Sequence, residues 1–234
     1  MPHQCIVILP AGGTGSRFGA AVPKQFTLLK GIPLLSHTLK IFAGHPRIAH
    51  IYVILAPAMA TTFAHDISTD ATTVLYCAGQ TRADTVRNAL MEIRKSFVDQ
   101  TWVLVHDAAR PCLSRQALDR MLDTLWDDAV GGLLAVPVAD TLKLEDSTQR
   151  VQRTVDRRGL WAAQTPQMFR LQPLLQALSD HSGATDESSA MEKQGYAPRL
   201  VMGESSNLKV TYPADLLLAQ YILETPAHAH RSGL

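Results

Sequence analysis

The sequence predicts an α/β fold of the doubly wound kind, with a mostly parallel sheet and helices on both faces. Apolar runs of strand length alternate with helical patterns along most of the chain, and these runs are continuously apolar. Strands of that kind are buried on both sides, as in a parallel sheet. With 234 residues, 46% of them hydrophobic, the chain can form a sizeable packed core. We expect ligands to bind at the carboxyl ends of the strands.

Six segments have the length and composition of buried strands. The first runs from Cys5 to Leu9 and ends at Pro10, and the second is residues 51–55. β-Branched, aliphatic and aromatic residues dominate both segments, which is typical of strands. The other expected strands are residues 73–76, 102–105, 133–136 and 199–202.

Helical patterns separate these strands. The apolar residues between 35 and 42 lie at helical spacing. Thr81 and Asp84 fit a capping box at the start of the next helix, and a further helix begins near Ser114. The other expected helices are residues 171–178, 185–194 and 213–223.

The alternation breaks at residues 139–160, which are polar and charged. Two strand-like pieces, residues 141–144 and 151–155, flank a turn, so a β-hairpin arm fits better than a core element. Arms of this kind often pack on a second subunit. We therefore expect a single domain over residues 1–225 that includes this arm, followed by a polar tail at residues 226–234.

Charge and cysteine content exclude several classes of function. The 22 Lys and Arg residues nearly balance the 21 Asp and Glu residues, so no global field would hold nucleic acid or an anionic membrane. Cys5, Cys77 and Cys112 lack the spacing of a disulfide framework or a zinc site. No stretch resembles a signal peptide or reaches the roughly 18 apolar residues of a membrane span. We expect a cytoplasmic protein.

A glycine-rich loop, residues 10–19, follows the first strand. Glycine lets backbone N–H groups approach an anion, but the loop matches neither the Walker A motif nor the dinucleotide fingerprint. Arg17 and Lys24 add two cations. Fixed cations stabilise the charge that develops when a triphosphate is attacked at its α-phosphorus. The alternative interpretation is a plain tight turn with solvated charges.

Eight blocks of residues occur in order along nearly the whole chain. They are the glycine loop with Pro23-Lys24-Gln25, GQ-x-R-x-x-TV at residues 79–86, VHDAARP at 105–111, DTLK at 140–143, TVDR at 154–157, QTPQ at 164–167, TDE at 185–187 and N-x-KVT at 207–211. In this combination the chain resembles the 2-C-methyl-D-erythritol 4-phosphate cytidylyltransferases.

The resemblance implies a Rossmann-like nucleotidyltransferase fold, a homodimer joined through the arm, and dependence on Mg²⁺. It also implies transfer of CMP from CTP to 2-C-methyl-D-erythritol 4-phosphate with release of pyrophosphate, a step of non-mevalonate isoprenoid biosynthesis. We expect a chain without a fused second catalytic domain.

The resemblance further assigns residues to roles. Arg17 and Lys24 would stabilise the pentavalent phosphorus, and Arg157 and Lys209 would hold the substrate phosphate. CTP would be bound by Pro10, Ala11, Gly12, Gly13, Gly15, Gly79, Gln80, Arg82 and Thr85. The pocket for the alcohol phosphate would be lined by Asp107, Arg110, Thr141, Thr165 and Thr185. The ligands of the metal stay unassigned.

Some residues depart from the family pattern. Gly12 stands where alanine is frequent, a form also found in the related ribitol-5-phosphate cytidylyltransferases. Gln80 replaces a common acid, and Thr85 replaces a common serine while keeping the hydroxyl. Ribitol 5-phosphate is therefore the alternative substrate, although Ala109 stands where those enzymes usually have valine. A non-catalytic nucleotide-binding regulatory module is the alternative of another class.

Several roles stay open at this point. Adjacent residues leaving a strand point to opposite faces, so we expect His106 to pack in the core and Asp107 to reach the site. Asp107 would contact either substrate hydroxyls or the Mg²⁺ shell. Thr185 would cap a helix, contact a ligand, or do both. Arg157 would act within its own chain or across a dimer.

Overall fold

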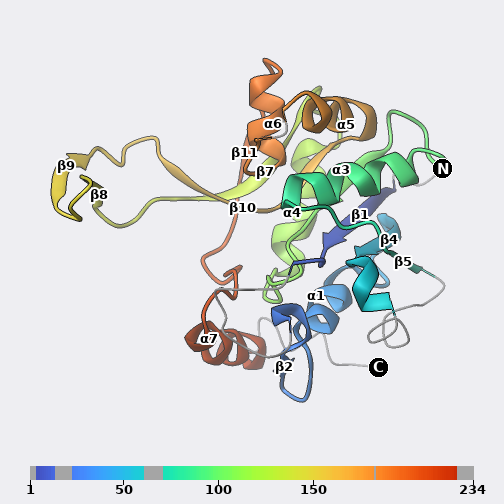
Figure 1. The fold of residues 1–234 in the computed structure, drawn as a ribbon, viewed down its shortest axis with the longest axis horizontal. Helices are drawn as coiled ribbons and strands as arrows, with labels where there is room; N and C mark the ends of the chain where they lie inside the picture. Colours follow the sequence, from blue (N-terminus) through green and yellow to red (C-terminus); the bar gives the residue numbers. More distant parts are fainter. Residues whose placement is uncertain (1–3, 14–22, 61–70, 182, 226–234) are drawn as a thin grey trace.

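The computed structural model describes residues 4–13, 23–60, 71–181 and 183–225. Its main sheet consists of β1 (Cys5–Pro10), β4 (Ile48–Ile54), β5 (Thr72–Leu75), β6 (Trp102–Val105), β7 (Gly131–Pro137), β10 (Trp161–Arg170) and β11 (Arg199–Met202). The strand order is β11-β7-β10-β6-β1-β4-β5 (Figure 1). All neighbours are parallel except β10, which is antiparallel to both β6 and β7. The predicted mostly parallel sheet is confirmed.

Helices cover both faces of this sheet. On one face, α1 (Leu34–Phe42) and α4 (Arg115–Leu125) contribute to one buried cluster. On the other, α3 (Arg82–Ile93), α5 (Leu171–Asp180) and α6 (Glu187–Lys193) form a second cluster. The sheet therefore separates two apolar layers, as the continuously apolar strands predict.

The first strand shows how the sequence produces these layers. Ile6 and Ile8 belong to the cluster under α3 and α5, whereas Val7 and Leu9 belong to the cluster under α1 and α4. All four side chains are fully buried. Successive side chains of a strand point to opposite faces, so both faces of a buried strand must be apolar. Each such side chain contributes about 1.5–3 kcal/mol by its burial.

A third, smaller cluster lies beside the main layers. It joins the last helix, α7 (Pro213–Glu224), to the short hairpin of β2 (Leu28–Leu29) and β3 (Ile32–Pro33). The described residues also contain two short 3-10 helices, η2 (Lys24–Phe26) and η3 (Pro57–Met59). None of the described helices is long and apolar enough to cross a membrane.

Helix starts follow the sequence signals with one exception. Thr81 and Asp84 form the predicted capping box of α3, and the Ser114 side chain accepts from the Ala117 N–H at the start of α4. Of the two roles left open for Thr185, the role of helix cap is wrong. Asp186 caps α6, because its side-chain carboxylate accepts a hydrogen bond from the Ser189 N–H. Aspartate is among the preferred capping residues, since its short side chain places an acceptor near the first N–H groups of the helix.

The strand β10 is absent from the sequence-based prediction, which places no strand at residues 161–170. Its sequence contains Gln164, Pro166 and Gln167, and its register with β7 shifts between Ala163 and Gln167. The Thr165–Pro166 peptide bond is cis. Proline and glutamine are unusual in a central strand, so the local pattern does not indicate one. The buried side chains of Gln164 and Gln167 are satisfied by individual hydrogen bonds.

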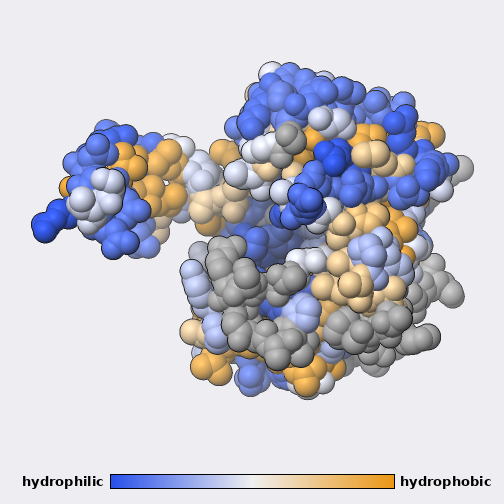
Figure 2. Space-filling view, viewed as in Figure 1, coloured by the Kyte–Doolittle hydropathy of each residue, from blue (hydrophilic) through white to orange (hydrophobic). Residues whose placement is uncertain are grey.

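The predicted hairpin arm is confirmed. β8 (Leu142–Glu145) and β9 (Val151–Val155) pair antiparallel. The turn between them is ordered by Asp146, whose carboxylate accepts from the Thr148 and Arg150 N–H groups. The arm stands clear of the body of the molecule (Figures 1 and 2).

Candidate active site

A cavity of about 250 Å³ lies at the edge of the sheet where β1, β5 and β6 end. These are the carboxyl ends of three parallel strands, where the fold class predicts a ligand. The predicted site residues that line it are Pro10, Ala11, Gly12, Gly13, Lys24, Gly79, Gln80, Arg82, Thr85, Asp107 and Lys209. Segments that are far apart in the sequence thus meet in one place.

The described part of the glycine loop is held by Gln25. Its Nε2 donates to the carbonyl of Ala11 (2.6 Å) and to the carbonyl of Gly13 (3.0 Å). The Ala11 N–H donates to the Ile54 carbonyl, so it is used within the chain. A Cβ at Gly12 would lie 2.2 Å from the Cβ of Ala78, so only glycine fits this position without movement. The predicted residues Gly15 and Arg17 lie outside the described residues.

The opposite wall of the cavity is the turn that leads into α3. The Thr85 hydroxyl accepts from the Gly79 N–H (3.0 Å) and donates to the Thr81 carbonyl (2.9 Å). A Cβ at Gly79 would lie 2.3 Å from the Cβ of Asp84, so the turn packs tightly on the helix. Thr85 therefore shapes the turn through the hydroxyl that it shares with serine. Gln80 lines the cavity beside it.

The Asp107 carboxylate lies among three cationic groups. Arg82 Nε is 2.9 Å from Oδ1, Lys209 Nζ is 2.9 Å from Oδ2, and Arg110 Nε is 3.5 Å from Oδ2. Burial alone would raise the pKa of Asp107, but these cations outweigh it and hold the pKa well below its usual range. Asp107 is therefore ionised.

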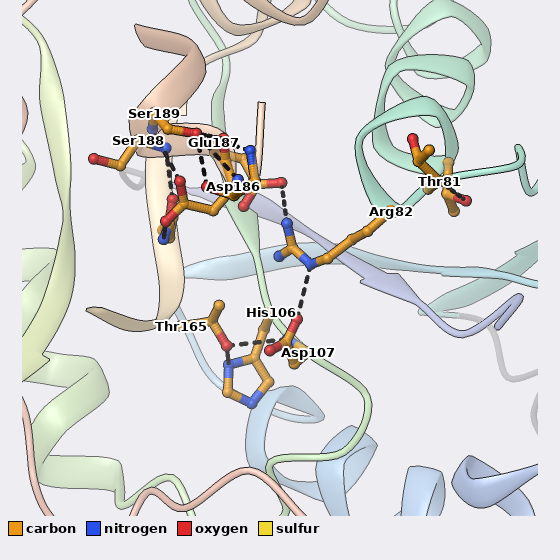
Figure 3. Close-up of polar contacts among 12 residues, drawn as sticks. Thr81, Arg82, His106, Asp107, Thr165, Asp186, Glu187, Ser188 and Ser189 are labelled. Carbon is orange, nitrogen blue, oxygen red and sulfur yellow. Dashed lines mark hydrogen bonds and ion pairs between the residues drawn. The ribbon is translucent and has the colours of Figure 1, made fainter. Parts of the chain in front are cut away.

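Arg82 joins Asp107 to a second carboxylate (Figure 3). Its Nη1 donates to Glu187 Oε1 at 2.7 Å, and the Glu187 side chain is fully buried. Burial raises the pKa of Glu187, and the ion pair with Arg82 offsets part of that rise. Burial would likewise lower the pKa of Arg82, but Glu187 and Asp107 outweigh it and raise it. The pair links the start of α3 to the start of α6.

Lys24 and Lys209 both line the cavity, and they come from two segments that are far apart in the sequence. Lys24 Nζ donates to the Val210 carbonyl at 2.6 Å, one residue beyond Lys209. Lys24, Arg82, Arg110 and Lys209 carry four positive charges, against two negative charges on Asp107 and Glu187. In a chain with a net charge of +1, the cavity and the residues directly behind it thus carry an excess of two positive charges. Positive charge is therefore concentrated in this part of the molecule.

His106 packs in the core, as predicted. Its ring is fully buried, with Nδ1 3.0 Å from the Thr165 hydroxyl and Nε2 3.1 Å from the Arg110 carbonyl. Burial lowers its pKa to about 4, so the ring is neutral near pH 7. The Thr165 hydroxyl also accepts from the Asp107 N–H (3.0 Å). His106 therefore orients the strand end that carries Asp107, and Thr165 is buried behind the cavity wall.

The remaining predicted residues do not line the cavity. Arg110 and Thr165 adjoin it through their contacts with Asp107. Thr185 is exposed just before α6. Thr141 and Arg157 lie on the exposed arm, where the Arg157 guanidinium donates to the Ala139 carbonyl.

The sequence analysis assigns no site role to several residues that matter here. Gln25, Thr81, Ala108 and Ala109 line the cavity, and Glu187 supports it from behind. Gln25 and Glu187 stand inside motifs quoted above, so the signal is present, but their burial is not visible in the sequence. Among the described residues, no group of three or more His, Cys, Asp or Glu side chains could hold a metal ion.

Comparisons with known proteins show which family the chain belongs to. The family model "IspD: 2-C-methyl-D-erythritol 4-phosphate cytidylyltransferase" matches residues 5–225. The cytidylyltransferase of that name from Laribacter hongkongensis is 52% identical over 223 residues, which cover 94% of this chain and 96% of the relative. That from Nitrosospira multiformis is 48% identical over 223 residues, with coverages of 93% and 96%.

Solved structures give the same result. A crystal structure of 4-diphosphocytidyl-2C-methyl-D-erythritol synthase superposes with a TM-score of 0.80 at 37% identity, covering 95% of this chain and all of the other. The 2-C-methyl-D-erythritol 4-phosphate cytidylyltransferase of Francisella tularensis has a TM-score of 0.82 at 32% identity, covering 94% of this chain and all of the other. The chain belongs to the 2-C-methyl-D-erythritol 4-phosphate cytidylyltransferase family.

Proposed function

We propose that this cavity is where CMP passes from CTP to 2-C-methyl-D-erythritol 4-phosphate. An oxygen of the alcohol's phosphate forms a bond to the α-phosphorus of CTP. The bond from that phosphorus to the bridging oxygen breaks, and pyrophosphate leaves with the electron pair. Negative charge grows on the phosphoryl oxygens and the leaving group, so fixed cations lower the barrier. The observation that carries the proposal is the cluster of cations around Asp107.

The nucleotide end of the cavity is the space between the glycine loop and the turn before α3. Backbone groups of Gly12 and Gly13 on one wall, and of Gly79 and Gln80 on the other, would contact cytosine and ribose. A slot with fixed hydrogen-bond partners rejects a wrong base, because that base would leave buried polar groups unpaired. Lys24 would contact the triphosphate, together with Arg17, which lies outside the described residues.

The acceptor end lies around Asp107. Lys209 and Arg110 would bind the phosphate of the alcohol, exchanging part of their contact with Asp107 for contact with the substrate. The Asp107 carboxylate would accept hydrogen bonds from substrate hydroxyls. Thr165 would support this end of the pocket from behind, through its hydrogen bond with the Asp107 N–H, and Thr185 would contact the substrate from its exposed position before α6.

Mg²⁺ would enter with the nucleotide. The only carboxylate that lines the cavity in the described part of the chain is Asp107, and cations already surround it. A carboxylate in that setting does not suit a divalent cation. Mg²⁺ commonly relies on phosphate oxygens and water, so the phosphates of CTP would be its ligands. When bound there, it would neutralise part of the charge of the triphosphate.

The arm would bring a second copy of the chain to the site. Leu144 and Val151 are 40% and 63% exposed on the arm, and Figure 2 shows apolar side chains there among hydrophilic ones. Apolar residues on a projecting hairpin favour packing against another surface. In a homodimer joined in this way, Thr141 and Arg157 would reach the acceptor pocket of the partner.

Mixed dimers test this role of the arm. Arg157→Ala subunits and Lys24→Ala subunits should each have low activity alone. Mixing and re-associating them should restore part of the activity, because one of the two sites then receives both an intact Lys24 and an intact Arg157. If mixtures stay as inactive as their components, Arg157 does not act across the dimer.

The function itself is tested by pyrophosphate release. With CTP, we expect a much higher kcat/KM for 2-C-methyl-D-erythritol 4-phosphate than for ribitol 5-phosphate, measured with both alcohols in parallel. An equal or inverted preference would contradict the assigned substrate. ATP in place of CTP is the control for base selection, and we expect little turnover with it.

A further inference from the structure

A buried amide, Asn207, lies between three segments of the site, and none of the roles above uses it. Its side chain is fully buried. The segment that it begins, residues 207–210, belongs to no helix or strand. The position of this segment therefore depends on individual hydrogen bonds and not on a regular ladder.

The side-chain donors of Asn207 hold the segment to the middle of β10. Nδ2 donates to the Thr165 carbonyl at 2.8 Å and to Gln164 Oε1 at 3.3 Å. Oδ1 is buried and has no hydrogen-bond partner among the described residues. The amide thus acts here through its donors.

The backbone of the same segment holds two cationic side chains of the site. The Asn207 carbonyl accepts from Arg110 Nη1 at 2.6 Å. Two residues further on, Lys209 Nζ contacts the Asp107 carboxylate at 2.9 Å. The Val210 N–H then donates to the Ala109 carbonyl (2.9 Å), and the Val210 carbonyl accepts from Lys24. The segment therefore carries one cation of the site, Lys209, and contacts two others, Arg110 and Lys24.

We propose that Asn207 is a positioning residue for the acceptor phosphate: it fixes the segment that carries Lys209 and the carbonyl that orients Arg110. This inference rests on the proposed function, in which these two cations bind the phosphate of the alcohol. Displacing a substrate-binding group by about 1 Å can lower the rate about 100-fold. Loss of the Asn207 donors should therefore impair use of the alcohol phosphate more than use of CTP.

The Asn207→Asp variant is the sharpest change. It keeps the shape of the side chain but replaces the donor by a second acceptor, which would face the Thr165 carbonyl and Gln164 Oε1. Asn207→Ser is the milder variant, because it removes the amide without adding a charge. Trp102→Phe is the matched control: Trp102 is buried and donates to the Trp126 carbonyl (3.1 Å) at the start of β6, the opposite end from the cavity.

Steady-state pyrophosphate release, with each substrate varied in turn, gives the readout. For Asn207→Asp we expect kcat/KM for 2-C-methyl-D-erythritol 4-phosphate to fall about 10- to 100-fold, while the KM for CTP changes less than about threefold. Asn207→Ser should show a smaller change of the same kind. If the Asp variant does not fold, the kinetics of the Ser variant test whether Asn207 has a positioning role. Trp102→Phe should lower the melting temperature without affecting the kinetic constants for one substrate more than those for the other.

The same measurements distinguish a failure of the proposed function from a failure of the role proposed for Asn207. If the wild type does not turn over the alcohol phosphate, the proposed function is wrong. If the wild type is active and the folded Asn207 variants show normal kinetics, or show equal effects on the kinetics of both substrates, Asn207 has no positioning role.

Discussion

The ammonium group of Lys209 lies 2.9 Å from the Asp107 carboxylate, in a cavity where Arg82 and Arg110 contact the same carboxylate. One buried carboxylate thus contacts three cations, and one of these, Arg82, also pairs with Glu187. A phosphate that enters can take over some of these contacts, because Lys209 is 39% exposed and meets the cavity. The site therefore holds its cations in place without the substrate, which reduces the reorganisation needed during the reaction.

Lys24→Ala should lower kcat by roughly 10²–10³ while CTP still binds measurably, because fixed charge is worth most in the transition state. Initial rates and CTP binding measured on the same preparation separate the two effects. Lys30→Ala is the matched control, since Lys30 is a half-exposed lysine that pairs with Glu224 away from the cavity. A loss confined to CTP affinity would contradict a role for Lys24 in the transition state.

Asp107→Asn should change how stability depends on pH. In the folded protein the pKa of Asp107 is held below its usual value near 4, because Arg82, Lys209 and Arg110 outweigh the effect of burial. Its ionised form therefore stabilises the fold above about pH 4, and this contribution fades as the pH falls toward the folded pKa. The urea-unfolding midpoints of wild type and variant should differ most at pH 6, and the difference should shrink steadily as the pH falls below about 4. A constant difference would contradict the ion cluster.

Glu187→Gln should destabilise the protein by about 2 kcal/mol, because it leaves the Arg82 guanidinium with one carboxylate in a buried setting. Glutamine keeps an acceptor of similar shape, so the fold should persist. The matched control is Glu92→Gln, which removes a half-exposed carboxylate paired with the exposed Lys95 and should have little effect. Urea denaturation measures both variants, and equal effects would show that the buried pair contributes no more than a surface pair.

Gly12→Ala should raise the KM for CTP at least about tenfold, because a Cβ would lie 2.2 Å from the Cβ of Ala78 and push the glycine loop away from the opposite wall. The double variant with Ala78→Gly removes the clashing atom and should recover most of the affinity. Kinetics of the single and double variants give the test. If Ala78→Gly brings no recovery, the close contact is not the cause.

The sequence predicts the fold where local signals are strong. Continuous apolar runs identify β1 and β6, and the Thr81–Asp84 capping box marks the start of α3. The strand β10 escapes detection because Gln164, Pro166 and Gln167 interrupt any apolar pattern. Its place in the sheet depends on partners that are distant in the chain.

The residues of the site likewise fall into those that the sequence identifies and those that it does not. The cationic glycine loop points to Lys24, and the end of a central strand points to Asp107. Lys209 is identified through the family resemblance. The burial of Glu187 and Asn207 is set by the packing of α6 and β10, so the sequence alone makes Glu187 resemble an ordinary acid at a helix start. Thr185 illustrates the limit: a capping signal spread over adjacent residues does not show which of them caps.

The central claim, that the cations of this cavity meet the phosphates of the substrates, is tested most directly by a crystal structure with bound CTP and Mg²⁺. We expect Lys24 Nζ to lie about 3 Å from an oxygen of the triphosphate, having exchanged its contact with the Val210 carbonyl, and cytosine to lie between Gly12 and Gly79. A triphosphate bound elsewhere, with Lys24 still on Val210, would contradict the account.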